Sequence, residues 1–363
     1  MKESVAVVGN GSTAIGPKGQ VYVNRHTVNF LIDLANNGKS ILYVESHVKL
    51  DRNSNLQDKE LKPVVAGTVD VGIRRPWTFF RFIRLLFSVD FVYFFYPGSF
   101  AKFGVLLCRA FSIPYGIYLR GERFNDSGVD FQNLSHASFV CCVLGLEFRL
   151  RNLNTPVITI RPMLDIHASD AYVREASSFV KQRWCILFVG RLEYSKGVVE
   201  LLDAAQLLAS RGIQFELILV GGGELYLPLF SRYGNHPGNN VRVVGVIDNK
   251  SDLYKLYEEA DFFVLPTHHE GFPRVLYEAM MKSCVVITTF VGGIGHVMTD
   301  NVNCVKIPVG DPVAISEVIF SLSCDVDKMC RISQSGHSTA LAIIESYPVH
   351  STKFLDLVNE INS

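Results

Sequence analysis

Short apolar runs alternate with helix-like segments along most of this chain. Residues 91–95 (FVYFF), 115–119 (YGIYL) and 139–143 (FVCCV) have the length of strands, and helical stretches such as residues 101–111 separate them. Strands that are apolar on both faces must be covered on both faces, which is typical of parallel sheets flanked by helices. The alternation resumes at residues 185–189 (CILFV). The sequence therefore predicts an α/β protein built on parallel sheets.

The chain is long enough for two domains of this kind. It has 363 residues, of which 48% are hydrophobic, so each half can bury its own core. We expect an N-terminal domain over residues 1–170, a C-terminal domain over residues 171–345 and a last helix over residues 346–363. The polar residues 165–178 are a candidate hinge.

Charge and cysteine content exclude several classes of protein. Residues 1–170 hold 19 Lys and Arg against 14 Asp and Glu, and the remaining residues hold 16 against 21. This imbalance is too small to predict a nucleic-acid partner. The eight cysteines form no C-x-x-C pair, which indicates free thiols in a reducing compartment. Residues 4–8 read as a strand rather than a signal peptide, and no apolar run reaches the length of about 18 residues that spans a membrane, so we expect a cytoplasmic protein.

Residues 261–282 (DFFVLPTHHEGFPRVLYEAMMK) predict a strand, a polar loop and a helix that Pro273 opens. A helix that starts at the carboxyl end of a strand directs free N–H groups at a crevice where anions bind. Glu270 in the loop and Glu278 in the helix can accept hydrogen bonds from sugar hydroxyls. The alternative is that Glu278 pairs with Arg274 on a solvated face and that Glu270 is an ordinary loop acid.

A second candidate site lies between the strand at residues 185–189 and the helix after it. Arg191 and Lys196 flank the start of this helix, with Ser195 as its predicted N-cap. Two cations beside a helix N-terminus form an anion cradle without a metal. No acidic D-x-D pair stands in a plausible loop, so we expect neither a metal nor another cofactor. The alternative is a surface pair in which Glu193 balances the charge.

Five segments in order resemble the motifs of the retaining, GT-B-fold glycosyltransferases of family four, the group 1 glycosyl transferases. Glu270 to Glu278 resembles the family's E-x7-E motif, and Phe188 to Leu192 with Ser195 to Gly197 resembles its G-R-L-x-x-x-K-G segment. The other three segments are Val220-Gly221-Gly222-Gly223, Val243-Val244-Gly245-Val246 and Gly292-Gly293.

The resemblance implies two Rossmann-like domains that face each other across a cleft, the GT-B fold. The C-terminal domain would bind a nucleotide diphosphate sugar, the N-terminal domain would bind the acceptor, and the last helix would return to the N-terminal domain. The implied reaction moves a hexose-type sugar, with retention, to a hydroxyl of a glycan or lipid-linked saccharide in surface polysaccharide biosynthesis.

The resemblance also assigns roles to residues. Arg191, Lys196 and Glu270 are the expected catalytic residues, with the two cations on the donor diphosphate and Glu270 on the hexose. Glu278 is expected on the ribose. The remaining expected donor-binding residues are Gly16, Gly19, Val246, Gly271, Phe272 and Pro273.

The chain departs from the family pattern at three positions. Arg120 stands near a strand end where a histidine is common, His296 stands for a glutamate and Cys304 stands for a glycine. Arg120 can contact the acceptor or a phosphate, or can form a salt bridge with an acid nearby. These departures leave a non-catalytic nucleotide-sugar-binding subunit as an alternative.

A rival fingerprint lies near the N-terminus. Gly9-x-Gly11-x-x-Ala14 follows the first strand, a loop is expected over residues 9–19, a helix over residues 20–37, and Glu45 ends the next strand. This spacing is typical of NAD- or FAD-dependent Rossmann oxidoreductases. However, Pro17 and Gly19 delay the helix beyond the glycines, which disfavours the dinucleotide interpretation.

Residues 74–87 (RRPWTFFRFIRLLF) mix arginines with large aromatic residues. Such a helix suits a membrane interface, which predicts peripheral contact with the cytoplasmic membrane face. The alternative is a core helix that packs Phe79, Phe82, Ile83 and Leu86 on the sheet and keeps Arg81 and other arginines in water.

Overall fold

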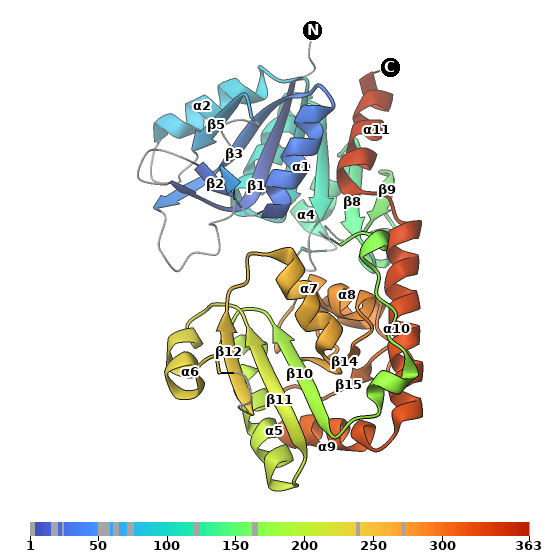
Figure 1. Cartoon of the computed structure of the whole chain (residues 1–363). Coiled ribbons are helices and arrows are strands. Elements are labelled where there is room, and N and C mark those ends of the chain that lie inside the picture. The colour runs from blue at the N-terminus through green and yellow to red at the C-terminus, as the bar shows by residue number, and fades with distance from the viewer. Residues whose placement is uncertain are drawn as a thin grey trace. The chain divides into compact units, whose positions relative to one another are not determined.

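The computed structural model describes residues 4–15, 21–23, 25–49, 59–60, 65–70, 76–119, 124–125, 127–161, 166–236, 240–270 and 273–362. The chain divides into two compact units (Figure 1). Unit 1 comprises Met1–Asp165 and Tyr347–Ser363, and unit 2 comprises Ile166–Ser346. Each unit is a mainly parallel sheet with helices on it, which confirms the predicted α/β class.

Nine strands of the described residues form the sheet of unit 1. Seven of them are parallel, in the spatial order β5 (Gly67–Asp70), β3 (Ser40–Lys49), β1 (Ser4–Ile15), β6 (Phe91–Tyr96), β7 (Tyr115–Leu119), β8 (Phe139–Val143) and β9 (Val157–Ile160). Strands β6, β7 and β8 are buried along their whole length, as their continuous apolar runs predict.

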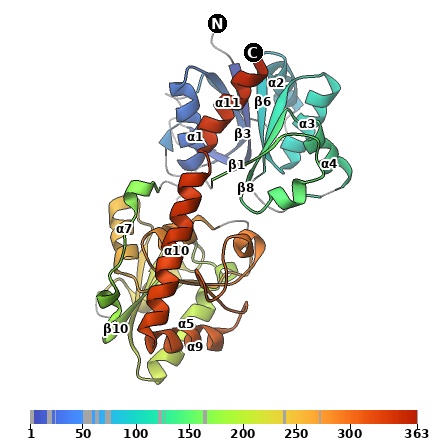
Figure 2. The ribbon, with the colours of Figure 1, turned by 90° about the vertical axis from the view of Figure 1, so that its right-hand side faces the viewer.

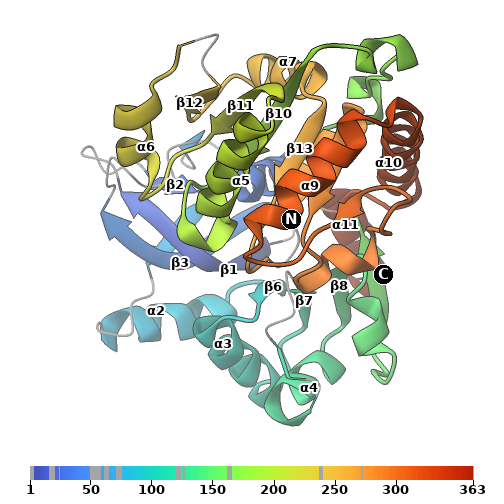
Figure 3. The same cartoon turned by 90° about the horizontal axis from the view of Figure 1, so that it is seen from below.

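Helices cover both faces of this sheet. They are α1 (Arg25–Asn36), α2 (Pro76–Leu86), α3 (Ser99–Ala110), α4 (Gly128–Ser135) and α11 (His350–Asn362). Successive side chains of β6 point to opposite faces. The centre of the Tyr93 ring lies 6.0 Å from that of Phe30 on α1 and 4.5 Å from that of Phe354 on α11. The next residue, Phe94, faces α3 at Gly104. Helices α2 and α3 lie side by side (Figure 3).

The predicted loop over residues 9–19 is wrong for its first part, because β1 continues to Ile15. Residues 12–15 pair in parallel with residues 46–49 of β3, after a register shift that follows Val8. Residues 14–15 also pair with β2 (Val21–Val23), which is antiparallel to β1 and pairs in turn with β4 (Lys59–Glu60). Helix α1 begins at Arg25. The glycines of the dinucleotide fingerprint therefore lie within a strand and not at a helix start.

The last predicted helix, over residues 346–363, is found as α11 (His350–Asn362), and a separate helix precedes it. Helix α10 (Val326–Ser346) ends unit 2, and α11 begins at His350. Pro348 lies between them and lacks the N–H that a continuous helix would need. Helix α11 belongs to unit 1 (Figure 2). Its residues Phe354 and Val358 are fully buried in the core of that unit.

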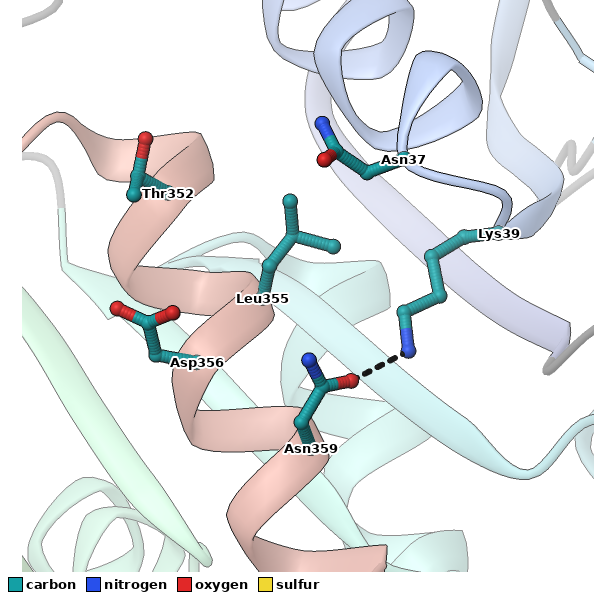
Figure 4. Close-up of a pocket in the computed structure, with 6 residues that line it drawn as sticks. All are labelled: Asn37, Lys39, Thr352, Leu355, Asp356 and Asn359. Atoms are coloured by element: carbon teal, nitrogen blue, oxygen red, sulfur yellow. Dashed lines mark hydrogen bonds between the residues drawn. The ribbon is translucent and has the colours of Figure 1, made fainter.

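A pocket lies between α11 and the end of α1 (Figure 4). Its lining residues are Asn37, Lys39, Thr352, Leu355, Asp356 and Asn359. Lys39 Nζ donates to Asn359 Oδ1 at 2.8 Å across the pocket. The pocket is thus partly bridged, and none of the predicted site residues lines it.

Asp130 of α4 is a buried carboxylate that ties three segments of unit 1 together. It accepts hydrogen bonds from Tyr96 Oη, from Lys102 Nζ at 2.9 Å and from the backbone N–H of Asn125 at 3.1 Å. Burial alone would raise the pKa of Asp130, but these donors outweigh burial and lower the pKa below its usual value.

Unit 2 contains a six-stranded parallel sheet. Its spatial order is β12 (Val241–Gly245), β11 (Gln214–Val220), β10 (Arg183–Val189), β13 (Phe262–Leu265), β14 (Val285–Thr288) and β15 (Val305–Lys306). The sheet is doubly wound. The chain adds β11 and β12 on one side of β10 and then returns to add β13, β14 and β15 on the other side, so the winding of the sheet reverses between β10 and β13. Ligands of such sheets bind beyond the carboxyl ends of the strands at that reversal.

Helices of unit 2 are α5 (Val198–Ser210), α6 (Tyr226–Tyr233), α7 (Lys250–Glu259), α8 (Arg274–Met281), α9 (Pro312–Ser323) and α10. Helix α5 packs beside α9, and α10 packs on α8 and β14. The short helix η2 (Ala168–Asp170) lies within the segment predicted as a hinge, and η3 (Ala176–Phe179) begins in it and ends one residue beyond it.

Asp261, directly before β13, is the buried ionic centre of unit 2. Its Oδ1 lies 3.0 Å from an Arg174 guanidinium nitrogen and 2.7 Å from Lys181 Nζ, and its Oδ2 accepts from the Cys185 N–H at 2.8 Å. Asp261 and Arg174 are both almost fully buried. The carboxylate therefore fastens the segment that enters unit 2 onto the sheet.

Candidate active site

Three loops meet at the carboxyl ends of β10, β11 and β13. Gly197, which precedes α5, has φ +71°, and a Cβ there would lie 2.1 Å from the carbonyl oxygen of Pro266 after β13. Gly221, after β11, has φ +137°, and a Cβ there would lie 1.9 Å from the carbonyl oxygen of Gly190 after β10. Only glycine fits these two contacts. The backbone approach places the residues of the three loops at one point of the sheet edge.

Lys196 and Glu270, predicted from separate motifs, form an ion pair at this point. Lys196 Nζ contacts Glu270 Oε1 and lies 3.4 Å from the carbonyl oxygen of His269. Lys196 is 9% exposed, so its ammonium is fixed in a place with little water. The pair lies between β10 and β13, where the winding of the sheet reverses.

The loop that carries Glu270 is attached to the Lys196 loop by further hydrogen bonds. The carbonyl oxygen of Ser195 accepts from the His268 N–H at 2.9 Å and from Thr267 Oγ1 at 3.2 Å. His268 Nε2 lies 2.8 Å from Glu200 Oε1 on α5. Thr267, His268 and Glu200 were not predicted from the sequence as positioning residues. The available signal was their position, because Thr267 and His268 follow the end of β13 and Glu200 lies in the first turn of α5.

Arg191 adopts the arrangement that the alternative interpretation predicted. Its guanidinium lies 2.7 Å from Glu193 Oε1, and 53% of its side chain is exposed. The predicted N-cap at Ser195 is wrong. Ser195 lies in the short helix η4 (Tyr194–Lys196), and Gly197 is the N-cap of α5 because its left-handed conformation turns the chain into the helix.

Glu278 is held by a tyrosine that was not predicted from the sequence. The hydroxyl of Tyr257, on α7, donates to Glu278 Oε2 at 3.0 Å. Burial is the main cause that raises the pKa of Tyr257 well above its usual value, and the negative charge of Glu278 raises it further. The phenol therefore stays protonated and donates. Glu278 thus has one oriented carboxylate oxygen. The contact joins residues 21 positions apart, and sequence spacing gave no signal for it.

Three other residues named from the sequence follow strands of this sheet, whereas Cys304 does not. Val246 follows β12 and is exposed, beside Gly222 of the loop after β11. Pro273 is the N-cap of α8 rather than its first residue. His296 is exposed at the end of η5 (Gly292–His296). Cys304 is fully buried, and burial raises the pKa of its thiol to about 12, so it belongs to the core.

Five predicted residues lie outside the described part of the chain: Gly16, Gly19, Arg120, Gly271 and Phe272. Within the described part, no three His, Cys, Asp or Glu side chains come together as a metal site requires. The expectation about cofactors stays a prediction.

Comparisons with known proteins relate unit 2 to sugar transfer. Residues 171–338 match the family described as Glycosyl transferases group 1. The capsular polysaccharide biosynthesis glycosyltransferase CapM from Staphylococcus aureus is 30% identical over 157 residues, which are 43% of this chain and 41% of CapM. The amylovoran biosynthesis glycosyltransferase AmsK from Erwinia amylovora is 30% identical over 145 residues, or 38% of this chain and 35% of AmsK. The chain spans about two fifths or less of the length of these relatives.

Solved structures share the fold over the whole chain. A glycosyltransferase from Rickettsia africae ESF-5 has a TM-score of 0.69 at 16% identity and covers 100% of this chain and 99% of its own. HepE from Anabaena in complex with UDP has a TM-score of 0.66 at 17% identity and covers 98% of this chain and 100% of its own. HepE also has a structure with UDP-glucose. These similarities confirm the predicted GT-B type of fold, with two Rossmann-like domains.

Proposed function

Residues 171–338 belong to the group 1 glycosyl transferases, and from this premise we propose that the protein is a retaining glycosyltransferase. It moves a hexose-type sugar from a nucleotide diphosphate sugar to a hydroxyl of a glycan or lipid-linked saccharide. The relatives that act in capsular polysaccharide and amylovoran biosynthesis support a role in surface polysaccharide synthesis.

The observation that carries the proposal is the buried contact between Lys196 and Glu270 at the reversal of the doubly wound sheet. A fixed ammonium beside a carboxylate suits a ligand with a diphosphate next to a hydroxyl-rich sugar. In the proposed complex, the diphosphate contacts Lys196 and Arg191, and the hexose hydroxyls donate to Glu270. This arrangement needs no metal.

The nucleoside would lie along the rest of the same edge. Glu278 is already oriented by Tyr257, and its carboxylate would accept hydrogen bonds from the two ribose hydroxyls. Val246, exposed beside the loop after β11, would contact the base. HepE, which binds UDP and UDP-glucose, supports a uridine donor as the first to test.

In the reaction, the bond between the anomeric carbon and the diphosphate oxygen breaks, and its electron pair stays on the diphosphate. The acceptor oxygen forms the new bond on the same face of the sugar, and its proton leaves with the released diphosphate. The charge that grows on the leaving group is stabilised by Lys196 and Arg191. The protein is proposed to act on the cytoplasmic side, with peripheral contact to a membrane that presents the acceptor.

Two other functions remain to be separated from this one by experiment. A dinucleotide oxidoreductase requires a helix at the glycines of the first strand, and β1 instead continues through them to Ile15. A non-catalytic binding subunit would keep the donor site without turnover.

The test is the melting temperature with UDP, GDP, ADP, NAD and FAD in turn. A ligand at a hundred times its dissociation constant stabilises by about 2.7 kcal/mol, which raises the melting temperature by roughly 5–11 °C for a unit of this size. We expect one nucleoside diphosphate to do so, and Glu278→Gln to reduce the shift. Glu317→Gln, an exposed glutamate on α9, is the matched control and should leave the shift unchanged.

A shift by NAD or FAD alone would refute the transferase. A nucleoside diphosphate shift without release of sugar from the corresponding nucleotide sugar, in the presence of glycan acceptors, would identify a binding subunit.

A further inference from the structure

Large apolar side chains are exposed together on α2, on α3 and on the residues just after these helices. The exposed fractions are 80% for Trp77, 66% for Phe80, 60% for Phe87 and 39% for Phe79, and Leu106 and Phe111 are also exposed. Together with Arg81 and Arg84, these residues are called the aromatic–basic surface. The alternative of a core helix is confirmed for Phe82 and Leu86, which are buried, and is wrong for Phe79.

The aromatic–basic surface is supported from below by close packing. Phe82 is fully buried, and its ring lies 4.5 Å from that of Phe100 on α3. A Cβ at Gly104 would lie 2.5 Å from the ring of Phe94 in β6, so α3 sits directly on the sheet. Above this layer, Phe79 packs on Phe103 at 4.7 Å. The exposed rings therefore stand on a rigid base.

The exposed residues of α2 follow the period of a helix. Trp77, Phe80, Arg84 and Phe87 are spaced at i, i+3, i+7 and i+10, so they share one face. Phe87 extends this face to α3 through an edge contact of 5.1 Å with Phe111. Three aromatic rings and one cation thus lie along one stripe that faces solvent.

The charge of this region has one sign. Helices α2 and α3 contain no Asp or Glu and contain four cations. Two of these cations are occupied by α4, since Lys102 pairs with Asp130 and Arg109 donates to Asn133. Arg81 and Arg84 are exposed among the aromatic rings.

We propose that the aromatic–basic surface docks on an anionic phospholipid bilayer. Aromatic rings enter the boundary between headgroups and acyl chains, while arginines bind the phosphates of anionic lipids. No helix within the described ranges is long and apolar enough to cross a membrane, so the contact proposed is with the surface of the bilayer. Docking is independent of the proposed transfer reaction. If that reaction is correct, docking also places unit 1 where a lipid-linked acceptor is available.

The first test is co-flotation with vesicles of phosphatidylcholine alone and of phosphatidylcholine with 30 mol% phosphatidylglycerol, without any nucleotide sugar. We expect binding to the anionic vesicles that weakens as salt is added. Each arginine near an anionic surface contributes about fivefold, so Arg81→Gln with Arg84→Gln should weaken binding about 25-fold. Trp77→Ser with Phe80→Ser should also release the protein.

A matched control removes the same types of residue elsewhere in unit 1. Phe148 and Arg151 are exposed and stacked, with the guanidinium 4.5 Å from the ring centre. Phe148→Ser with Arg151→Gln should leave flotation unchanged. All these side chains are exposed, so the variants should keep the wild-type melting temperature, which verifies that they fold.

The second test uses the two tryptophans of the chain. Trp184 is buried in unit 2 against Phe262, and Trp77 is exposed on α2. In the Trp184→Phe variant, the emission of Trp77 should shift to the blue on anionic vesicles and should be quenched by brominated lipids. Unchanged emission would overturn the proposal even if the protein floats.

Three further outcomes would overturn it. Equal binding to neutral and anionic vesicles would remove the role of the arginines. Flotation of the aromatic variant at the wild-type level would place the contact elsewhere. Dimerisation in solution that the Trp77→Ser and Phe80→Ser changes abolish would show that a second copy covers this surface.

Discussion

Replacing Lys196 with alanine tests whether its ammonium stabilises the transition state or only holds the donor. The side chain is about nine-tenths buried and is fixed by Glu270 and by the carbonyl oxygen of His269. In the proposed reaction, charge on the diphosphate grows as the bond to the sugar breaks, so a fixed cation gains most in the transition state. The loss of one preorganised group of this kind costs about 2.7–4 kcal/mol, or 10²–10³ in kcat.

The assay measures release of the nucleoside diphosphate at saturating donor, and the dissociation constant of the donor is measured separately by titration. We expect Lys196→Ala to lower kcat by 10²–10³ and to weaken donor binding by less than about tenfold. Lys255→Ala is the control, because Lys255 is an exposed lysine with a carboxylate partner, Asp252. It should change neither quantity.

Lys196→Ala also leaves Glu270 without its partner, so the melting temperature must be recorded in parallel. Glu270 keeps 20% of its side chain exposed, and water can solvate the carboxylate. The double variant with Glu270→Gln separates the two effects through a mutant cycle. Equal losses in donor affinity and in kcat/KM, with kcat unchanged, would refute the reasoning, because the lysine would then only bind.

Three predictions concern stability. Gly221→Ala should lower the melting temperature by roughly 6–12 °C or more, because backbone strain and overlap of the new Cβ cost at least about 3 kcal/mol. Gly295→Ala is the control and should change the melting temperature little, because its Cβ meets no atom within 3.5 Å. Similar shifts for the two variants would refute the close approach at Gly221. Asp261→Asn should cost about 3–5 kcal/mol in chemical denaturation because it leaves a buried guanidinium unpaired, and the exposed Asp252→Asn should cost less than about 1 kcal/mol. The lowered pKa of Asp130 stabilises the fold above about pH 4, and this stabilisation is lost as the pH falls through the native pKa. Asp130→Asn should therefore make the free energy of unfolding depend less on pH in the acid range. An unchanged pH profile would contradict the assignment.

The sequence predicted those parts of the site that depend on local order. Lys196 follows a buried strand, and Glu270 follows another buried strand in the same sheet. Parallel strands place their carboxyl ends at one edge, so the two residues come together whatever the details of the packing. Their direct ion pair was not predicted, because the motifs assigned each residue to a different part of the donor.

Contacts between distant helices could not be predicted in this way. Tyr257 reaches Glu278 because α7 and α8 pack beside each other, and His268 reaches Glu200 because α5 starts beside the loop after β13. Each contact depends on the rotation of a helix about its axis, which the apolar period fixes only to within one face. A polar residue at the border of that face can point to solvent or to a neighbour.

The first strand shows why a glycine-rich segment is a weak predictor of a loop. Gly9 and Gly11 favour a turn locally, yet residues 12–15 find parallel partners in residues 46–49 and an antiparallel partner in β2. The parallel ladder joins segments more than 30 residues apart, and no local preference encodes it. Because the same pairing continues the strand past the glycines, it removes the helix start that a dinucleotide phosphate needs. The long-range contact that the sequence concealed thus argues against the dinucleotide-binding function that the sequence most readily suggested for this segment.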